Sequence, residues 1–245
     1  MRKGFVGMWA VLLLIVAVKV LHIMEPFVVM LAWTVVLAVY LLVKNGLPKL
    51  SQAAASLLLG GAVAAACLLH GIGVMGLIFF ALPTLICSLA VFSVLDKKGT
   101  GIFCGRDAKS VLLSLGIGAA AGVVLTLINT FVFKSDLPAD PVLSPVRIIW
   151  ALQPGIAEEI ASRAIFMAMC LYMAGEKMSK AETFTMYAAM ILPHAIAHNF
   201  GLVECLMLAV VFGIPLVLLQ RKRDIASAIT AHFIIDAVRF VIYGG

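Results

Sequence analysis

Long stretches of apolar residues, separated by short polar segments, make up almost the whole chain. Each stretch is close to the length of about 20 residues that an α-helix needs to cross a bilayer, so roughly eight or nine spans fit. This leaves no room for a soluble domain of ordinary size. The apolar runs cover residues 4–21, 27–43, 50–69, 73–95, 110–133, 147–174, 183–202, 204–219 and 225–243.

The composition agrees with this pattern. Of the 245 residues, 64% are hydrophobic and 12% are charged, whereas a soluble domain is roughly half apolar and about a quarter charged. So few polar side chains cannot cover a soluble protein, which excludes a soluble enzyme, a nucleic-acid-binding protein and a disordered chain. We therefore predict an all-α polytopic membrane protein that lies in a lipid bilayer and has no nucleic-acid partner.

Cationic residues concentrate in alternate loops. Thirteen of the 18 Lys and Arg residues precede the first run or follow the second, fourth, sixth and eighth runs. Loops rich in Lys and Arg remain in the cytoplasm, so the pattern predicts nine spans with a cytoplasmic N-terminus, in the cell membrane of a bacterium. The opposite loops contain only Lys19, Lys134 and Arg147, beside Glu25, Asp136, Asp140 and Glu204.

The two parts of the chain differ in the ionisable residues inside their runs. Residues 1–146, with five predicted helices, have almost none, whereas residues 147–245, with four, have eight. Each costs about 2.5–3.5 kcal/mol inside a bilayer, so those that are present usually have a function. Three carboxylates and three histidines at similar depth predict one polar cavity among the C-terminal helices. The eight residues are Glu158, Glu159, Arg163, His194, His198, His232, Asp236 and Arg239.

The spacing of these residues predicts their partners. Residues four apart lie on one face of a helix, so Glu159 can pair with Arg163. Glu158 is rotated by about 100° from Glu159, which leaves its carboxylate to face the cavity. His194 and His198 also share a face, about 5.4 Å apart along the helix, and this displacement predicts that only one of them reaches a given water molecule.

Small residues predict where helices approach closely. Gly118 and Gly122 form a G-x-x-x-G pair in the fifth run, and Gly61 with Ala65 forms a weaker pair in the third. Residues of this size at this spacing allow close helix packing in lipid. They indicate packing and carry no chemistry.

Several hydrolase motifs are incomplete. His194 and His198 have the spacing of the zinc motif H-E-x-x-H, but Ala195 occupies the position of the general base. A base would have to come from another helix, where Glu158 is available. There is no G-x-S-x-G nucleophile motif, and Asp236 is the single aspartate inside a run, which argues against serine and two-aspartate proteases.

Three short motifs resemble those of the CPBP intramembrane proteases, the CAAX-protease and bacteriocin-processing family, also called the Abi family. Residues 158–163 match the signature E-E-x-x-x-R, His198 matches the histidine of F-x-x-x-H, and His232 with Asp236 match H-x-x-x-N/D. The resemblance covers about residues 147–243. It departs from the family at His194, which occupies the position of the phenylalanine, and we favour His198 over His194 as the motif histidine.

The resemblance implies a peptidase that hydrolyses a membrane-associated or leader-type peptide. Glu158 and His198 would activate the attacking water, and His232 with Asp236 would stabilise the oxyanion. Substrates of this class include leader peptides of bacteriocins, peptide pheromones and prenylated C-terminal peptides.

The remaining residues would support that chemistry. Glu159 and Arg163 would hold the helix of Glu158 in place, and His194 would assist as a neighbour. Glu158, His198 and His232 also offer the ligand set of a catalytic zinc ion. The family has been described both as metalloproteases and as metal-free glutamate proteases, and the sequence leaves both open.

Other interpretations of the polar cluster also remain. The same family includes members associated with bacteriocin self-immunity and with scaffolding, so a non-proteolytic binding protein is an alternative. A proton- or metal-coupled transporter also places Glu, His and Asp inside the membrane. A cluster with a purely structural role is a third alternative.

Overall fold

The computed structural model describes residues 2–99, 101–105, 107–131, 141–198 and 201–244, and no strand occurs among them. The loop residues Arg106, Lys134, Asp136 and Asp140 lie outside the described part. The helices are α1 (Lys3–Val20), α2 (Pro26–Asn45), α3 (Leu50–Leu69), α4 (Gly73–Gly76), η1 (Leu77–Ala81), α5 (Leu82–Lys97), α6 (Ala108–Phe131), α7 (Pro145–Trp150), α8 (Leu152–Glu159), η2 (Ile160–Ala164), α9 (Ile165–Ala174), α10 (Lys180–Ala197), α11 (Leu202–Leu208), η3 (Ala209–Gly213), α12 (Ile214–Lys222) and α13 (Ile225–Tyr243).

Seven helical stretches in the described part are long and apolar enough to cross a membrane. They are α1, α2, α3, the continuous stretch Gly73–Lys97, α6, the continuous stretch Leu202–Lys222, and α13. The prediction of an all-α polytopic membrane protein is thereby confirmed. The predicted eight or nine spans also include the runs at 147–174 and 183–202, which form helices in the structure but are not among these seven stretches.

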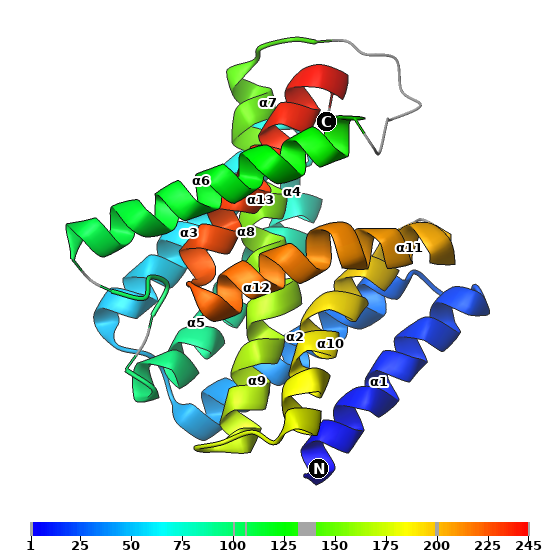
Figure 1. Cartoon of the computed structure of the whole chain (residues 1–245), viewed down its shortest axis with the longest axis vertical. Coiled ribbons are helices and arrows are strands. Elements are labelled where there is room, and N and C mark those ends of the chain that lie inside the picture. The colour runs from blue at the N-terminus through cyan, green and yellow to red at the C-terminus, as the bar shows by residue number, and fades with distance from the viewer. Residues whose placement is uncertain (1, 100, 106, 132–140, 199–200, 245) are drawn as a thin grey trace.

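The helices form a bundle in which α13 crosses α6 and α8, and α1 lies at the edge beside α10 (Figure 1). The stretch Gly73–Lys97 is the most buried of the seven apolar stretches. One hydrophobic cluster includes Leu41 and Val91 from the predicted N-terminal region and Phe166 and Met190 from the C-terminal one. The two regions therefore share a core.

Glycines allow α6 and α13 to approach closely. A Cβ atom at Gly118 would lie 2.5 Å from the Ser227 carbonyl oxygen, and one at Gly122 would lie 2.9 Å from that of Ala231. The G-x-x-x-G prediction is thus confirmed.

The prediction for Gly61 and Ala65 is wrong, because the contact surface of α3 is rotated by one residue. A Cβ atom at Gly61 would meet nothing within 4 Å, whereas one at Gly60 would lie 3.0 Å from Leu85 on α5.

Helix α10 has well-defined ends. Ser179 accepts a hydrogen bond from the backbone N–H of Glu182, and the Glu182 carboxylate accepts one from the N–H of Ser179, which forms a capping box. Pro193 lies within the helix and has no N–H to donate. The helix ends at Ala197, and His198 has an extended backbone with φ −65° and ψ 146°.

The helix that carries the two glutamates changes geometry directly after them. Helix α8 ends at Glu159, and η2 is a wider, π-helical turn that leads into α9. Gln220 on α12 donates a hydrogen bond of 3.2 Å to the carbonyl oxygen of Glu159. A Cβ atom at Gly155 would lie 3.1 Å from the backbone of Phe233, so α8 packs closely on α13. This packing brings Glu158 beside His232.

Candidate active site

A cavity of about 590 Å³ lies among the C-terminal helices, which agrees with the predicted location. This volume is within the range of about 300–1,000 Å³ that is typical of ligand sites. Six of the seven predicted site residues line it, and Glu159 lies behind it with 0% of its surface exposed. The six residues are Glu158, Arg163, His194, His198, His232 and Asp236.

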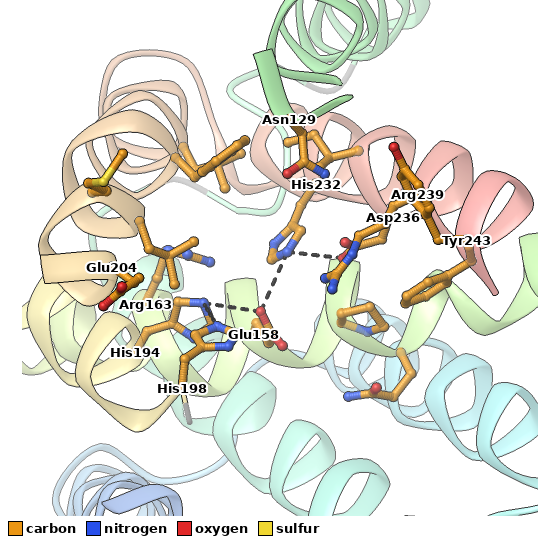
Figure 2. A pocket seen from close by; sticks show the side chains of 18 residues that line it. Asn129, Glu158, Arg163, His194, His198, Glu204, His232, Asp236, Arg239 and Tyr243 are labelled. Carbon is orange, nitrogen blue, oxygen red and sulfur yellow. Dashed lines mark hydrogen bonds and ion pairs between the residues drawn. The ribbon is translucent and has the colours of Figure 1, made fainter. Parts of the chain in front are cut away.

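Glu158 lies between histidines of two other helices (Figure 2). Its Oε2 atom is 3.2 Å from Nε2 of His194 on α10 and 3.4 Å from Nε2 of His232 on α13. The Glu158 side chain is 25% exposed, so it remains accessible from the cavity. Residues from three helices therefore meet at one carboxylate oxygen.

The rings of His194, near the end of α10, and of His198, just after it, lie in contact. Their Nε2 atoms are 3.2 Å apart, and their ring centroids are 4.7 Å apart. The prediction that a one-turn displacement separates them is wrong, because His198 lies just beyond the last helical residue and its ring meets that of His194. His194, predicted as an assisting neighbour, lies with its Nε2 atom 3.2 Å from Oε2 of Glu158.

His232 is held at both ring nitrogens. Nδ1 is 2.7 Å from Oε1 of Glu159, and Nε2 is 3.2 Å from Oδ2 of Asp236 as well as 3.4 Å from Glu158. These contacts fix the orientation of the ring relative to the cavity. Asp236 therefore contacts His232 and helps to orient its ring.

The predicted ion pair lies beneath this ring. Arg163 Nη1 donates a hydrogen bond to Oε1 of Glu159, the same oxygen that faces His232. The two side chains are 2% and 0% exposed. Glu159 thus has two partners within the protein, whereas Glu158 faces the cavity, as the helical spacing predicted.

The site can also accommodate a metal ion. The ligand atoms of Glu158, His194 and His198 all lie within 4.8 Å of one another. In a tetrahedral zinc site with bonds of about 2.0–2.1 Å, neighbouring ligand atoms are about 3.3 Å apart. The distances of 3.2 Å from His194 Nε2 to Glu158 and to His198 fit that geometry.

This ligand group differs from the predicted one. It contains His194 in place of His232. The nitrogens of His232 both face carboxylate oxygens, of Glu159 on one side and of Asp236 and Glu158 on the other.

Several lining residues were not predicted as site residues. Asn129 comes from α6, outside the predicted catalytic region, and its only sequence signal is a polar residue within an apolar run. The sequence predicted Arg239 as a charged residue inside a span and Glu204 as a loop residue, and it assigned neither to the site. The additional polar lining residues are Asn129, Gln153, Glu204, Arg239 and Tyr243.

No family model, curated protein or solved structure matches this chain. The resemblance to the CPBP proteases therefore rests on the three sequence motifs alone.

Proposed function

We propose that this chain is an intramembrane endopeptidase of the CPBP type that hydrolyses a membrane-associated or leader-type peptide. The observation that carries the proposal is the convergence of Glu158 with His194, His198 and His232 in a cavity of a membrane protein. Ionisable groups inside a bilayer are costly, and their concentration at one accessible point indicates chemistry.

Each residue has a role in this proposal. Glu158 accepts a proton from water while the water oxygen attacks the carbonyl carbon of the peptide bond. His232 donates a hydrogen bond to the carbonyl oxygen, which becomes negatively charged. The proton on Glu158 then passes to the departing nitrogen as the C–N bond breaks. Glu159 holds the His232 ring through Nδ1, so the donor is the Nε2–H, which lies beside Asp236 in the free protein and is shared with the oxyanion when substrate is bound.

Glu158, His194 and His198 would hold a zinc ion or a similar divalent cation. Such an ion supplies Lewis-acid polarisation of water and of the peptide carbonyl. His232 and Asp236 lie outside this ligand group, so their role toward the oxyanion is the same with or without the ion.

The proposed location is the cell membrane with the N-terminus in the cytoplasm, on the basis of the distribution of Lys and Arg. The start of α1 and the end of α13 lie at opposite ends of the molecule (Figure 1), which supports termini on opposite sides. The test compares Glu25→Cys with Lys98→Cys, both exposed, in a chain without the five native cysteines. A membrane-impermeant thiol reagent added to intact cells should label only Glu25→Cys. Labelling of both or of Lys98→Cys alone contradicts the orientation.

The catalytic proposal is tested by comparing the peptides of cells that produce the wild type, Glu158→Gln or Ser162→Ala. Ser162 lies in η2, close to Glu158 in sequence, and serves as a matched control. Peptides with new termini should appear with the wild type and Ser162→Ala. Purified Glu158→Gln in lipid vesicles should cleave them on the order of 10²–10⁴-fold more slowly, the usual contribution of a general base.

Other outcomes identify the alternatives. Equal cleavage by Glu158→Gln rejects the mechanism. Peptide binding without cleavage by the wild type indicates a binding protein, and uptake of metal ions or protons into the vesicles without cleavage indicates a transporter.

A further inference from the structure

Helix α1 contributes no side chain to the described lining of the cavity, yet it is bonded to α10 at several points. At its start, Arg2 forms an ion pair of 3.3 Å with Glu182. In its middle, Trp9 Nε1 donates a hydrogen bond of 3.0 Å to Thr185 Oγ1. These contacts keep α1 alongside α10, the helix that carries His194 and leads directly into His198.

The third contact is at the other end of α10. Lys19 Nζ donates hydrogen bonds of 3.0 Å to the carbonyl oxygen of Ile196 and of 2.6 Å to that of His198. The last carbonyl groups of a helix have no partner within it, and a cation is favourable there. Lys19 therefore binds the backbone at the point where α10 ends.

This contact matters for His198 in particular. Its backbone is extended, so the hydrogen bonds of α10 do not by themselves fix its position. Its ring nevertheless has to stay 3.2 Å from the ring of His194. An active site requires its side chains to be held within about 0.5 Å of the productive geometry.

We propose that Lys19 is a positioning residue, which holds the backbone of His198 so that its ring meets Glu158 and His194. The inference rests on the proposed peptidase function and adds a residue from the N-terminal region to its machinery. Lys19 Nζ binds the backbone carbonyl oxygens of Ile196 and His198, and Lys19 is not among the described lining residues of the cavity, so it acts through His198 and not on the substrate.

The experiment compares Lys19→Met, Lys19→Arg and Arg2→Met in lipid vesicles. Lys19→Met removes the donor but keeps much of the side-chain volume, and it should lower kcat about tenfold to hundredfold with little change in KM, the cost of a misplacement of about 1 Å. Lys19→Arg retains a donor and should recover most of this loss. Arg2→Met loosens α1 at its other end and should leave kcat within about twofold of the wild type.

A second measurement does not depend on hydrolysis. In protein with ¹⁵N-labelled histidine, Lys19→Met should shift the ring nitrogen resonances of His198 and leave those of His232 unchanged, while Arg2→Met shifts neither. Unchanged His198 resonances in folded Lys19→Met overturn the proposal, as does an equal loss of kcat in Arg2→Met. If the wild type cleaves no peptide, the proposed function fails, and the resonances still decide the role of Lys19.

Discussion

Two polar clusters share helix α13, and each contains an aspartate that lies on or next to that helix. The Asp224 cluster lies at the start of the helix and consists of Cys104, Ser110, Ser114, Arg223, Asp224 and Ser227. The Glu158 cluster lies further along and consists of Glu158, His194, His198, His232 and Asp236.

In the Asp224 cluster, both carboxylate oxygens of Asp224 accept hydrogen bonds from other groups of the protein. Asp224 Oδ1 accepts from the N–H of Ser227 at 2.9 Å, and Oδ2 accepts from the N–H of Cys104 at 3.0 Å and from the hydroxyl of Ser114. Arg223 donates to Ser114 Oγ at 3.1 Å. Asp224 is 5% exposed, and no member of the cluster is among the described lining residues of the cavity.

The Glu158 cluster has the opposite character. The Glu158 carboxylate faces histidine rings, which can gain or lose a proton, and its side chain is 25% exposed to the cavity. The comparison teaches that polarity inside a membrane protein does not by itself indicate chemistry. A cluster bound by backbone N–H groups at a helix start stabilises the fold, whereas one made of titratable partners beside a cavity can bind water or substrate.

The largest expected effect concerns the buried ion pair of Glu159 and Arg163, which lies beneath the Glu158 cluster. Arg163→Ala should lower the free energy of unfolding by about 3–5 kcal/mol, because it leaves the buried Glu159 carboxylate without its cation. Thermal and chemical unfolding in detergent measure this. The double variant Glu159→Gln/Arg163→Met removes both charges and should recover much of the loss. A larger destabilisation by Glu158→Gln than by Arg163→Ala would show that the two glutamates have exchanged roles.

A somewhat smaller effect is expected from the histidines of α10. Because their Nε2 atoms meet, His194→Ala and His198→Ala should each lower kcat about hundredfold, and the double variant should be little worse than either. Kinetics with the peptides identified above measure this. His22→Asn is the control, since His22 is exposed and its φ of 50° suits asparagine. Wild-type activity in either alanine variant would remove that histidine from the site.

The smallest effect is expected at the Asp224 cluster. Asp224→Ala removes the N-cap of α13 and should lower the free energy of unfolding by about 1–2 kcal/mol, with kcat unchanged within about twofold. Asp224→Asn keeps an acceptor for the Ser227 N–H and should lose less. Unfolding and peptide kinetics are measured on the same samples. A tenfold loss of kcat in folded Asp224→Ala would show that the two clusters are coupled through α13.

Much of the fold could be predicted from the sequence, because the apolar runs are separated by clear polar segments. The run at 50–69, for example, became Leu50–Leu69, and the run at 225–243 became Ile225–Tyr243. Local spacing was equally informative: the four-residue separation of Glu159 and Arg163 predicted their ion pair. These features depend on residues close together in the sequence.

The remaining features depend on tertiary packing. The meeting of His194 and His198 requires α10 to end at Ala197, which its apolar pattern does not indicate. The sequence predicted Lys19 as a cationic residue of a loop. The packing of α1 on α10 brings its side chain to the backbone of His198. The Asp224 cluster joins residues 104–114 to residues 223–227, more than a hundred positions away, and no local pattern links them.

The π-helical turn η2 has a consequence for insertions and deletions. A π-helical turn contains one residue more than the α-helical turn it replaces, and it follows directly after Glu158 and Glu159. Deleting one residue between Ile160 and Ala164 would restore an unbroken α-helix with almost the same hydropathy. Because the π-helical turn accommodates the extra residue, the register between the glutamates and α9 would stay nearly the same. A one-residue deletion within the regular helix α9, where no such turn accommodates it, would instead rotate the glutamates by about 100° relative to the end of that helix, so a gap in η2 and a gap in α9 have opposite consequences for the cavity although a hydropathy profile shows neither.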